Sequence, residues 1–301
     1  MMLIPILDTK EHKIIIHNVN SNSITCDVLM TDKTGNKIYF TGWIWAPPFG
    51  YSEINLSNEL IQDSNNSEIF LKLSQENNIL LEEFLYFDFT KNKKTINLEG
   101  FEVTVFLNDL ISCNIIKTNK FWEVDLFERF LPYLQDIKDI IDCGANLGSH
   151  SLMFHKYFPK SQIYSFEPSS TNYELLLSNT KKIDHIHTFK TALSSTRGTL
   201  RMEIPFSWNR GSTTVTVSKS GELVQSSLLD DFALENISFI KIDVEGHELE
   251  LIKGSLNTII NNRPIIWLED FTGDTKTFLE TRLGYRTISF DEHSNYLLSS
   301  N

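Results

Sequence analysis

The densest group of reactive side chains in this chain is the run Lys241-Ile242-Asp243-Val244-Glu245-Gly246-His247-Glu248. Alternation along an extended segment places Lys241, Asp243 and Glu245 on one side. The imidazole has the unperturbed pKa nearest 7 among these side chains, so His247 is the candidate general base. Acids at the start of a helix also cap it and complement its dipole, which is the purely structural interpretation of the same run.

A second candidate site is the glycine turn in residues 140–148, Ile-Ile-Asp-Cys-Gly-Ala-Asn-Leu-Gly. Gly144 and Gly148 let the backbone pass close to a ligand, and a helix from Ser149 points free N–H groups there. Asp142 would repel a pyrophosphate, and the turn lacks the G-x-G-x-x-G spacing of dinucleotide sites. A cationic ligand without phosphate fits better, and S-adenosylmethionine carries an ammonium and a sulfonium charge. An ordinary strand–helix turn without a ligand is the alternative.

A second acid strengthens the case for a ligand. The short apolar-rich run 161–166 ends in Glu167-Pro168, so Glu167 lies at the carboxyl end of the next strand. In a parallel sheet this end lies beside the glycine turn. The Glu167 carboxylate can accept hydrogen bonds from both hydroxyls of a ribose there.

From about Ile116 to the end, the chain resembles the FkbM-type family of S-adenosylmethionine-dependent methyltransferases. Five segments carry the resemblance in order: IIDCGANLGSHSLMF (140–154), IYSFEPSSTNYELLLSN (163–179), TALSSTRGTL (191–200), FIKIDVEGHELELIKG (239–254) and RPIIWLE (263–269). The resemblance implies methyl transfer, usually to a hydroxyl of a sugar or another natural product. It implies cofactor contacts from Asp142, Gly144, Ala145, Asn146, Gly148, Glu167, Pro168, Ala192 and Asp243.

The predicted catalytic residues are Asp243, Glu245 and His247. His247 is expected to take the acceptor proton, with Glu245 as its orienting or metal-binding neighbour. Asp243 can instead contact the methionine ammonium, which leaves the other two residues for the acceptor. A divalent cation held by Asp243, Glu245, His247 or Glu269 is an open alternative, but a complete ligand set is not evident, so no metal site is predicted.

Strands and helices alternate from residue 138 onward, which predicts a parallel sheet covered on both faces. With a closing antiparallel hairpin, the expectation is an α/β fold with the seven-stranded Rossmann-like methyltransferase sheet. An amphipathic helix is predicted over Phe121–Leu134, with Pro132 as a kink or an earlier end. Residues 197–228 are expected to form an inserted hairpin, in which Trp208–Gly211 could line the acceptor site. The pairs His150/His155 and His185/His187 are expected on helix and strand surfaces.

The first third of the chain has a different pattern. Strand-like runs and turn residues predict a small N-terminal β-rich module over residues 1–115, followed by the methyltransferase domain over 116–301. Trp43, Trp45, Phe49 and Tyr51 form an aromatic group, which fits a module core better than a sugar platform. The module could bind the acceptor or mediate assembly, and a homodimer is possible.

Composition excludes several classes of protein. The net charge is −12, and 41% of the residues are hydrophobic. Neither half is basic, so a nucleic-acid partner is not expected. No apolar run approaches the ~20 residues of a membrane span, and Met1–Leu7 is too short for a signal segment, so a cytoplasmic location is expected. The three cysteines are scattered and suggest neither a disulfide framework nor a metal site.

Three functions follow from these features. The leading prediction is O-methylation of a sugar, glycan or natural-product hydroxyl with S-adenosylmethionine as the cofactor. N-methylation of an amide or peptide would use the same cofactor site. A non-catalytic binding module is disfavoured because Asp142, Gly144, Gly148, Glu167 and Asp243 are all intact.

Overall fold

The computed structural model describes residues 3–8, 13–18, 24–31, 37–46, 51–55, 68–75, 78–86, 93–107, 109–203, 214–216, 221–291 and 294–300. The chain divides into two compact units. The first contains Met1–Asn97 and Val105–Asn119, and the second contains Leu98–Thr104, Lys120–Pro205 and Gly211–Asn301. The domain boundary at residues 115/116 stays a prediction.

The first unit is built on antiparallel sheets, as the alternating sequence pattern predicts. One sheet has the order β1 (Leu3–Asp8), β2 (Lys13–Asn18) and β5 (Tyr51–Asn55). The other has the order β4 (Lys37–Ala46), β3 (Ile24–Thr31), β6 (Glu68–Gln75) and β7 (Asn78–Tyr86). Ile14 and Ile16 on β2 are fully buried. The side chains of the predicted aromatic group lie outside the described residues.

Three further elements link this part of the chain to the next. They are β8 (Lys93–Leu98), β9 (Phe101–Phe106) and the helix α2 (Leu110–Thr118). Asp109 caps α2, because its carboxylate accepts hydrogen bonds from the Ser112 backbone N–H and hydroxyl, each at 2.9 Å. The helix therefore begins where a capping residue precedes an apolar run.

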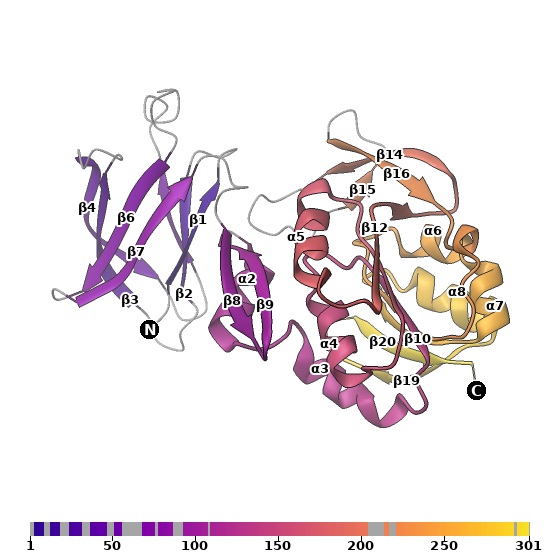
Figure 1. Ribbon diagram of the computed structural model, residues 1–301. Coiled ribbons are helices and arrows are strands. Elements are labelled where there is room, and N and C mark those ends of the chain that lie inside the picture. The colour runs from indigo at the N-terminus through magenta and orange to yellow at the C-terminus, as the bar shows by residue number, and fades with distance from the viewer. Residues whose placement is uncertain are drawn as a thin grey trace. The chain divides into compact units, whose positions relative to one another are not determined.

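The second unit contains the predicted seven-stranded sheet (Figure 1). Its spatial order is β12 (Ile186–Phe189), β11 (Ile163–Phe166), β10 (Asp139–Cys143), β17 (Ile237–Ile242), β18 (Ile265–Glu269), β20 (Asn295–Ser299) and β19 (Arg286–Phe290). The neighbours from β12 to β18 pair in parallel, whereas β20 pairs antiparallel with both β18 and β19. The predicted α/β class and the closing antiparallel hairpin are confirmed.

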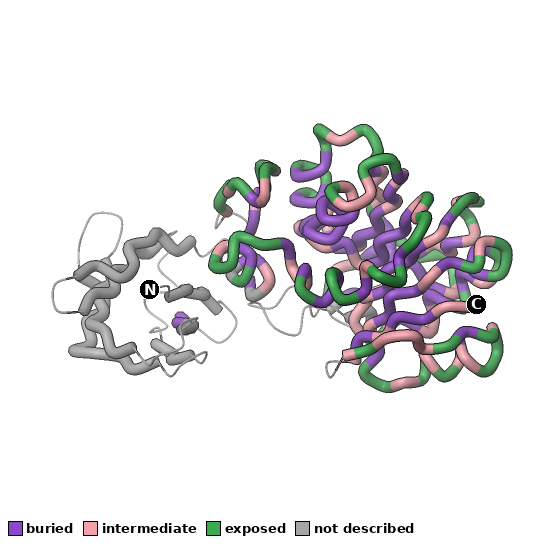
Figure 2. The backbone as a smooth tube through the Cα atoms, turned by 90° about the horizontal axis from the view of Figure 1, so that it is seen from below, coloured by how far each residue is buried: buried purple, intermediate pink, exposed green. Residues whose placement is uncertain are grey.

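Helices cover both faces of this sheet (Figure 1). One side carries α3 (Val124–Phe130), α4 (Ser149–Tyr157) and α5 (Ser170–Thr180). The other carries α6 (Glu248–Lys253), α7 (Leu256–Asn262) and α8 (Asp274–Leu283). Figure 2 shows buried residues concentrated in the sheet, as expected for strands covered on both faces.

The helix predicted over 121–134 is shorter than expected. It begins at Val124 and ends at Phe130, and a 3₁₀ turn with Pro132 near its start follows at Leu131–Tyr133. The expected early end at Pro132 is thus confirmed. Phe127 and Phe130 pack on Trp267 of β18, with ring centroids 6.1 and 5.6 Å away. Burial of these rings holds the short helix on the sheet.

The insert forms a small sheet of its own. Its order is β13 (Ala192–Leu193), β16 (Glu222–Ser227), β14 (Gly198–Glu203) and β15 (Thr214–Thr216). The predicted hairpin corresponds to the antiparallel pair β14 and β15, whereas β16 was not predicted. Trp208–Gly211 lies outside the described residues.

Candidate active site

The glycine turn after β10 is shaped by packing against its neighbours. Gly144 has φ +81°, and a Cβ there would lie 1.8 Å from the backbone oxygen of Asp243. Gly148 has φ +93°, and its Cβ would lie 3.0 Å from a methyl group of Leu176. A side chain at either position would therefore point into the protein and collide with it. Glycine is needed at both positions so that the turn can lie against the end of β17 and against α5.

Glu167 joins this turn to the loop after β11. Its Oε2 accepts a hydrogen bond from the backbone N–H of Asn146 at 2.9 Å, and its Oε1 accepts one from that of Ser169 at 2.8 Å. Asn146 adopts φ +51°, which directs its N–H toward the carboxylate. A carboxylate offers about four lone-pair sites, so each oxygen of Glu167 can accept one further hydrogen bond.

Burial makes the charged form of Glu167 costly. Loss of hydration raises its pKa to about 7, although the two backbone N–H groups act in the opposite direction. The negative charges of Asp142 and Glu222 raise this pKa further. A cationic ligand with hydroxyl donors would offset both effects.

Asp142 lies beneath the turn and is fully buried. Its Oδ2 accepts a hydrogen bond from the Ser151 hydroxyl at 2.6 Å. Its Oδ1 has no hydrogen-bond partner among the described residues. Because buried acceptors are nearly always satisfied, this oxygen marks a place where a donor from a ligand or a water would fit.

The remaining predicted cofactor residues lie in three places. Ala145 belongs to the turn, where its N–H and that of Gly144 donate to the Phe166 oxygen at 2.9 and 3.0 Å. Pro168 follows Glu167 and is half-buried. Ala192 is buried on β13 in a small core with Met202 and Val224. Contact of these residues with a cofactor stays a prediction.

A second group of ionisable side chains lies at the ends of β17 and β18. Lys241 is almost fully buried, and its Nζ donates to Asp243 Oδ2 at 2.8 Å. Burial disfavours the ammonium, but the carboxylates of Asp243, Asp142 and Glu123 outweigh burial and raise the pKa of Lys241. Lys241 was recognised in the sequence only as part of an alternating run, and its role as a buried counter-ion was missed.

Asp243 shares a hydrogen bond with Glu269. Burial acts to raise the pKa of Asp243, but the charge of Lys241 and the hydrogen bonds from Glu269 and Lys241 bring it below its usual value. Burial and the negative charge of Asp243 raise the pKa of Glu269 to about 10. At neutral pH, Asp243 is therefore a carboxylate and Glu269 keeps its proton and donates to it.

The prediction that His150 lies on a helix surface is wrong. It is 5% exposed, and its ring meets that of Trp267 edge to face with centroids 5.2 Å apart. Its Nε2 lies 3.3 Å from Glu123 Oε2. The helix pattern does not show this burial, because the covering residues come from other segments, Trp267 from β18 and Glu123 from the turn before α3. His155 is half-buried, His185 is exposed and His187 is half-buried.

Glu245 and His247 follow β17, which ends at Ile242, so strict alternation does not extend to them. Glu245 adopts φ +54°, and burial together with the charges of Asp243 and Glu248 raises its pKa to about 8. His247 Nε2 lies 3.0 Å from the Ser194 hydroxyl. Burial lowers the pKa of His247, and Glu250 acts in the opposite direction. The structure thus groups Asp243 with Lys241 and Glu269, and places the His247 ring against Ser194.

The expected capping role of this run is also present. Glu248 Oε1 accepts a hydrogen bond from the Gly246 N–H at 2.8 Å, whereas His247 makes no side-chain cap. No group of three or more His, Cys, Asp or Glu side chains within the described ranges is arranged to hold a metal ion. In the same ranges, no helix combines the length and hydrophobicity needed to cross a membrane.

An exposed aromatic side chain follows the acidic group closely in the sequence. Phe271 follows Glu269 by two residues and is 69% exposed. Asp270 fixes this loop, because its Oδ1 accepts from the backbone N–H of Thr272 and Gly273 and its Oδ2 from that of Lys276. The ring is therefore displayed on an ordered turn at the carboxyl end of β18.

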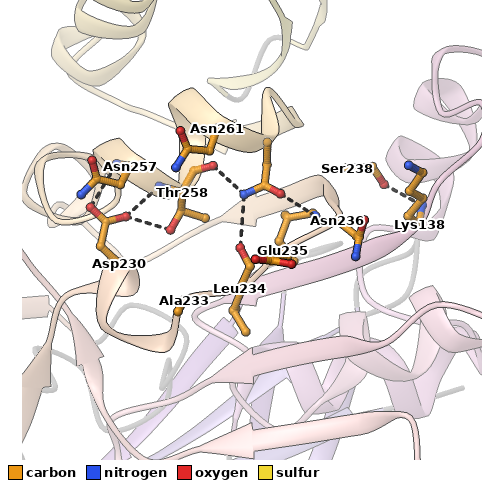
Figure 3. Close-up of a pocket in the computed structure, with 12 residues that line it drawn as sticks. Lys138, Asp230, Ala233, Leu234, Glu235, Asn236, Ser238, Asn257, Thr258 and Asn261 are labelled. Atoms are coloured by element: carbon orange, nitrogen blue, oxygen red, sulfur yellow. Dashed lines mark hydrogen bonds between the residues drawn. The ribbon is translucent and has the colours of Figure 1, made fainter.

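A separate hollow of about 660 Å³ lies at the opposite edge of the sheet (Figure 3). It is lined by residues near the starts of β10 and β17 and on α7, among them Lys138, Asn236 and Asn261. Asp230 in its wall accepts hydrogen bonds from the backbone N–H of Asn257 and Thr258 at 3.0 and 2.8 Å. None of the predicted site residues lines this hollow, so it is distinct from the site described above.

Comparison with known proteins connects this geometry to a family. The family model described as "Methyltransferase FkbM domain" matches residues 142–297. The hexuronic acid methyltransferase AglP of Haloferax volcanii is 27% identical over 146 residues, which cover 46% of this chain and 58% of that protein. The 2-O-methyltransferase NoeI of Sinorhizobium fredii is 28% identical over 145 residues, which cover 41% of this chain and 60% of that protein. The chain thus spans about three-fifths of the length of these relatives.

Solved structures include similar proteins. The crystal structure of methyltransferase FkbM from Methylobacillus flagellatus KT is 20% identical, with a TM-score of 0.40, and the match covers 55% of this chain and 44% of that one.

Proposed function

Because the chain belongs to the FkbM methyltransferase family, we propose that it transfers a methyl group from S-adenosylmethionine to a hydroxyl of a sugar or another natural product. Two of its relatives are named as a hexuronic acid methyltransferase and a 2-O-methyltransferase, which supports a sugar hydroxyl as the acceptor. A homodimer stays a prediction.

The observation that carries this proposal is the pair of acids around the glycine turn. Glu167 is fixed by two backbone N–H groups and keeps two lone-pair sites, which suits the two hydroxyls of a ribose. Asp142 has a buried oxygen without a partner among the described residues, which suits a cationic donor. The residues present therefore fit S-adenosylmethionine. The proposed cofactor contacts are Asp142, Gly144, Ala145, Asn146, Gly148, Glu167, Pro168, Ala192 and Asp243.

On the acceptor side, the chain provides a negative charge and orients the acceptor hydroxyl. The cofactor would bring an electrophilic methyl group on a sulfonium. Asp243, kept ionised by Lys241 and Glu269, can accept a hydrogen bond from the acceptor hydroxyl or from the methionine ammonium. Glu245 and His247 remain the sequence-based candidates for proton transfer. Most of the gain expected here comes from orientation of the hydroxyl against the methyl carbon.

A two-stage experiment tests the proposal. Calorimetry with S-adenosylhomocysteine should detect 1:1 binding to the full chain. A screen with labelled S-adenosylmethionine and a panel of hexuronic acids, other sugars and small amides should then give a methyl ether on a sugar hydroxyl. Absence of cofactor binding, or labelling confined to the amides, would contradict the proposal.

A further inference from the structure

The turn before α3 is held on the first turn of α4. The Trp122 N–H donates to the Ser149 hydroxyl at 2.9 Å, so the next residue in each segment, Glu123 and His150, come face to face. Glu123 precedes the helix at its N-cap position but makes no side-chain cap. It also adopts φ +56°, a conformation that is uncommon for a residue with a side chain. Its local conformation is therefore determined by something other than capping of α3.

The Glu123 carboxylate faces His150 instead. Its Oε2 lies 3.3 Å from His150 Nε2, a contact without hydrogen-bond geometry, and this nitrogen has no hydrogen-bond partner among the described residues. The imidazole is fixed between the rings of Trp267 and Phe154, whose centroids lie 5.2 and 6.0 Å away. A small rotation of the carboxylate would make the hydrogen bond that joins a base to its orienting acid, and such bonds are often long until the substrate is bound.

This pair lies at the edge where an α/β sheet binds ligands. Trp267, which His150 contacts, precedes Glu269 on β18, and Lys241 Nζ lies 6.0 Å from the centre of the Trp267 ring. The positive form of His150 also favours the ionised form of Asp243. Among the described residues, the charged groups around His150 include Glu123 from the turn before α3 and Asp243 just after β17, and Lys241 lies against the Trp267 ring that His150 contacts.

The neighbouring groups are poor proton acceptors. Lys241 is already protonated, because nearby carboxylates raise its pKa. Glu269 also holds its proton at neutral pH, since its pKa is about 10. Asp243 is occupied by hydrogen bonds from both of them. The ring of His247 lies against Ser194, and Glu250 is the charged group that acts on its pKa.

We propose that His150 is the base that takes the proton of the acceptor hydroxyl and that Glu123 is its positioning residue. This inference rests on the proposed methyl transfer. As the acceptor oxygen bonds to the methyl carbon, the sulfur–methyl bond breaks and its electron pair stays on sulfur. The hydroxyl proton moves to Nδ1 of His150, while Nε2–H faces the Glu123 carboxylate. The imidazolium then releases its proton to solvent.

A spectroscopic test needs no acceptor. In long-range ¹H–¹⁵N spectra of the full chain with S-adenosylhomocysteine, His150 should show the neutral tautomer with the proton on Nε2. Glu123→Gln should convert this signal to a mixture of tautomers, whereas Glu128→Gln on the exposed side of α3 should leave it unchanged. The proton on Nδ1 in the parent protein, or no response to Glu123→Gln, would overturn the assignment.

The kinetic test uses hexuronic acids with labelled S-adenosylmethionine. His150→Gln should lower turnover by ~10²–10⁴-fold, the usual contribution of a positioned base, with affinity for S-adenosylhomocysteine within about threefold of the parent. His155→Gln, five residues further along α4, is the matched control and should keep turnover. Added imidazole should restore part of the turnover of His150→Gly.

Two outcomes separate this inference from the proposed function. If the parent protein does not bind S-adenosylhomocysteine, the proposed function itself is wrong. If it binds the cofactor and methylates the acceptor but His150→Gln retains full turnover, only the assignment of His150 is wrong. Loss of turnover in His247→Gln alone would move the role of base to His247.

Discussion

The cofactor half and the acceptor half of the proposed site hold their acids in different ways. Glu167 is fixed by backbone N–H groups of Asn146 and Ser169, all within the first two strand–helix units of the sheet. Asp243 is fixed by the side chains of Lys241 and Glu269, from two different strands, with His150 of α4 nearby. The first arrangement follows from the local path of the chain. The second requires three distant segments to meet, so it depends on the completed fold.

The two halves also differ in how they compensate negative charge. Lys241 provides a buried counter-ion for Asp243. Glu167 has backbone dipoles but no cationic partner among the described hydrogen bonds and ion pairs, and its pKa is raised to about 7. The acceptor half is thus charge-compensated by the protein itself. Glu167 in the cofactor half is compensated only when a cation binds.

Removal of Lys241 should have the largest effect on stability. Lys241→Met leaves the Asp243 carboxylate partly buried without its counter-ion, which should lower the free energy of unfolding by about 3–5 kcal/mol. Urea denaturation at pH 7 measures the change. Lys253→Met is the matched control, because Lys253 pairs with Glu250 on the surface with 42% of its side chain exposed. The control should lose less than ~1 kcal/mol. Equal losses in the two variants would contradict a special role for the buried pair.

The free energy of unfolding should depend on pH through the titration of Glu167. Burial raises its pKa from 4.5 to about 7, so the folded state favours the protonated carboxyl. Its stabilising contribution is full below about pH 4.5 and is lost as pH rises through about 7. Glu167→Gln should therefore gain stability relative to the parent over this range, by up to roughly 3 kcal/mol. Denaturation of both proteins without cofactor from pH 4.5 to 8 measures it. A constant difference across that range would show that Glu167 is not desolvated.

The same titration should affect cofactor affinity in the opposite direction, because the ionised form of Glu167 that lowers stability is the form that binds the cofactor. Hydrogen bonds from two ribose hydroxyls need the ionised carboxylate, so affinity should fall as pH drops below about 7, by at most ~10-fold per pH unit. In Glu167→Gln this dependence should disappear.

The smallest effect is expected at the exposed ring of Phe271, which we expect to contact the acceptor. Phe271→Ala should raise the KM for a sugar acceptor roughly fivefold, since stacking on the ring covers roughly 40 Å² of apolar surface at about 25 cal/mol per Å². Affinity for S-adenosylhomocysteine should not change. Phe290→Ala is the control, because Phe290 is 68% exposed at the end of β19, two strands beyond β18. A similar rise in KM for both variants would argue against stacking of the sugar on the Phe271 ring.

The two halves also differ in how far the sequence predicts them. The turn around Asp142 and the position of Glu167 could be predicted, because each follows a short apolar strand and the chemistry lies within a few residues. The contacts of His150 and Glu123 could not, because a helix pattern does not show which distant segment covers it. The positive φ of Glu123 and Glu245 also has no sequence signature, since neither is a glycine or an asparagine. The insert strand β16 has no clear alternating pattern, because its two apolar residues, Leu223 and Val224, are adjacent.

We propose that the acids around the glycine turn bind S-adenosylmethionine. Calorimetry, which measures the affinity of the chain for S-adenosylhomocysteine, tests this proposal. The parent chain should bind at 1:1 stoichiometry at pH 8. Glu167→Ala should weaken binding tens of fold or more, because it removes hydrogen bonds to a charged group that contribute roughly 1.5–3 kcal/mol. Glu235→Gln, in the wall of the hollow at the opposite edge of the sheet, should bind like the parent. Equal affinity of Glu167→Ala and the parent would contradict the claim and show that the cofactor site is wrongly placed.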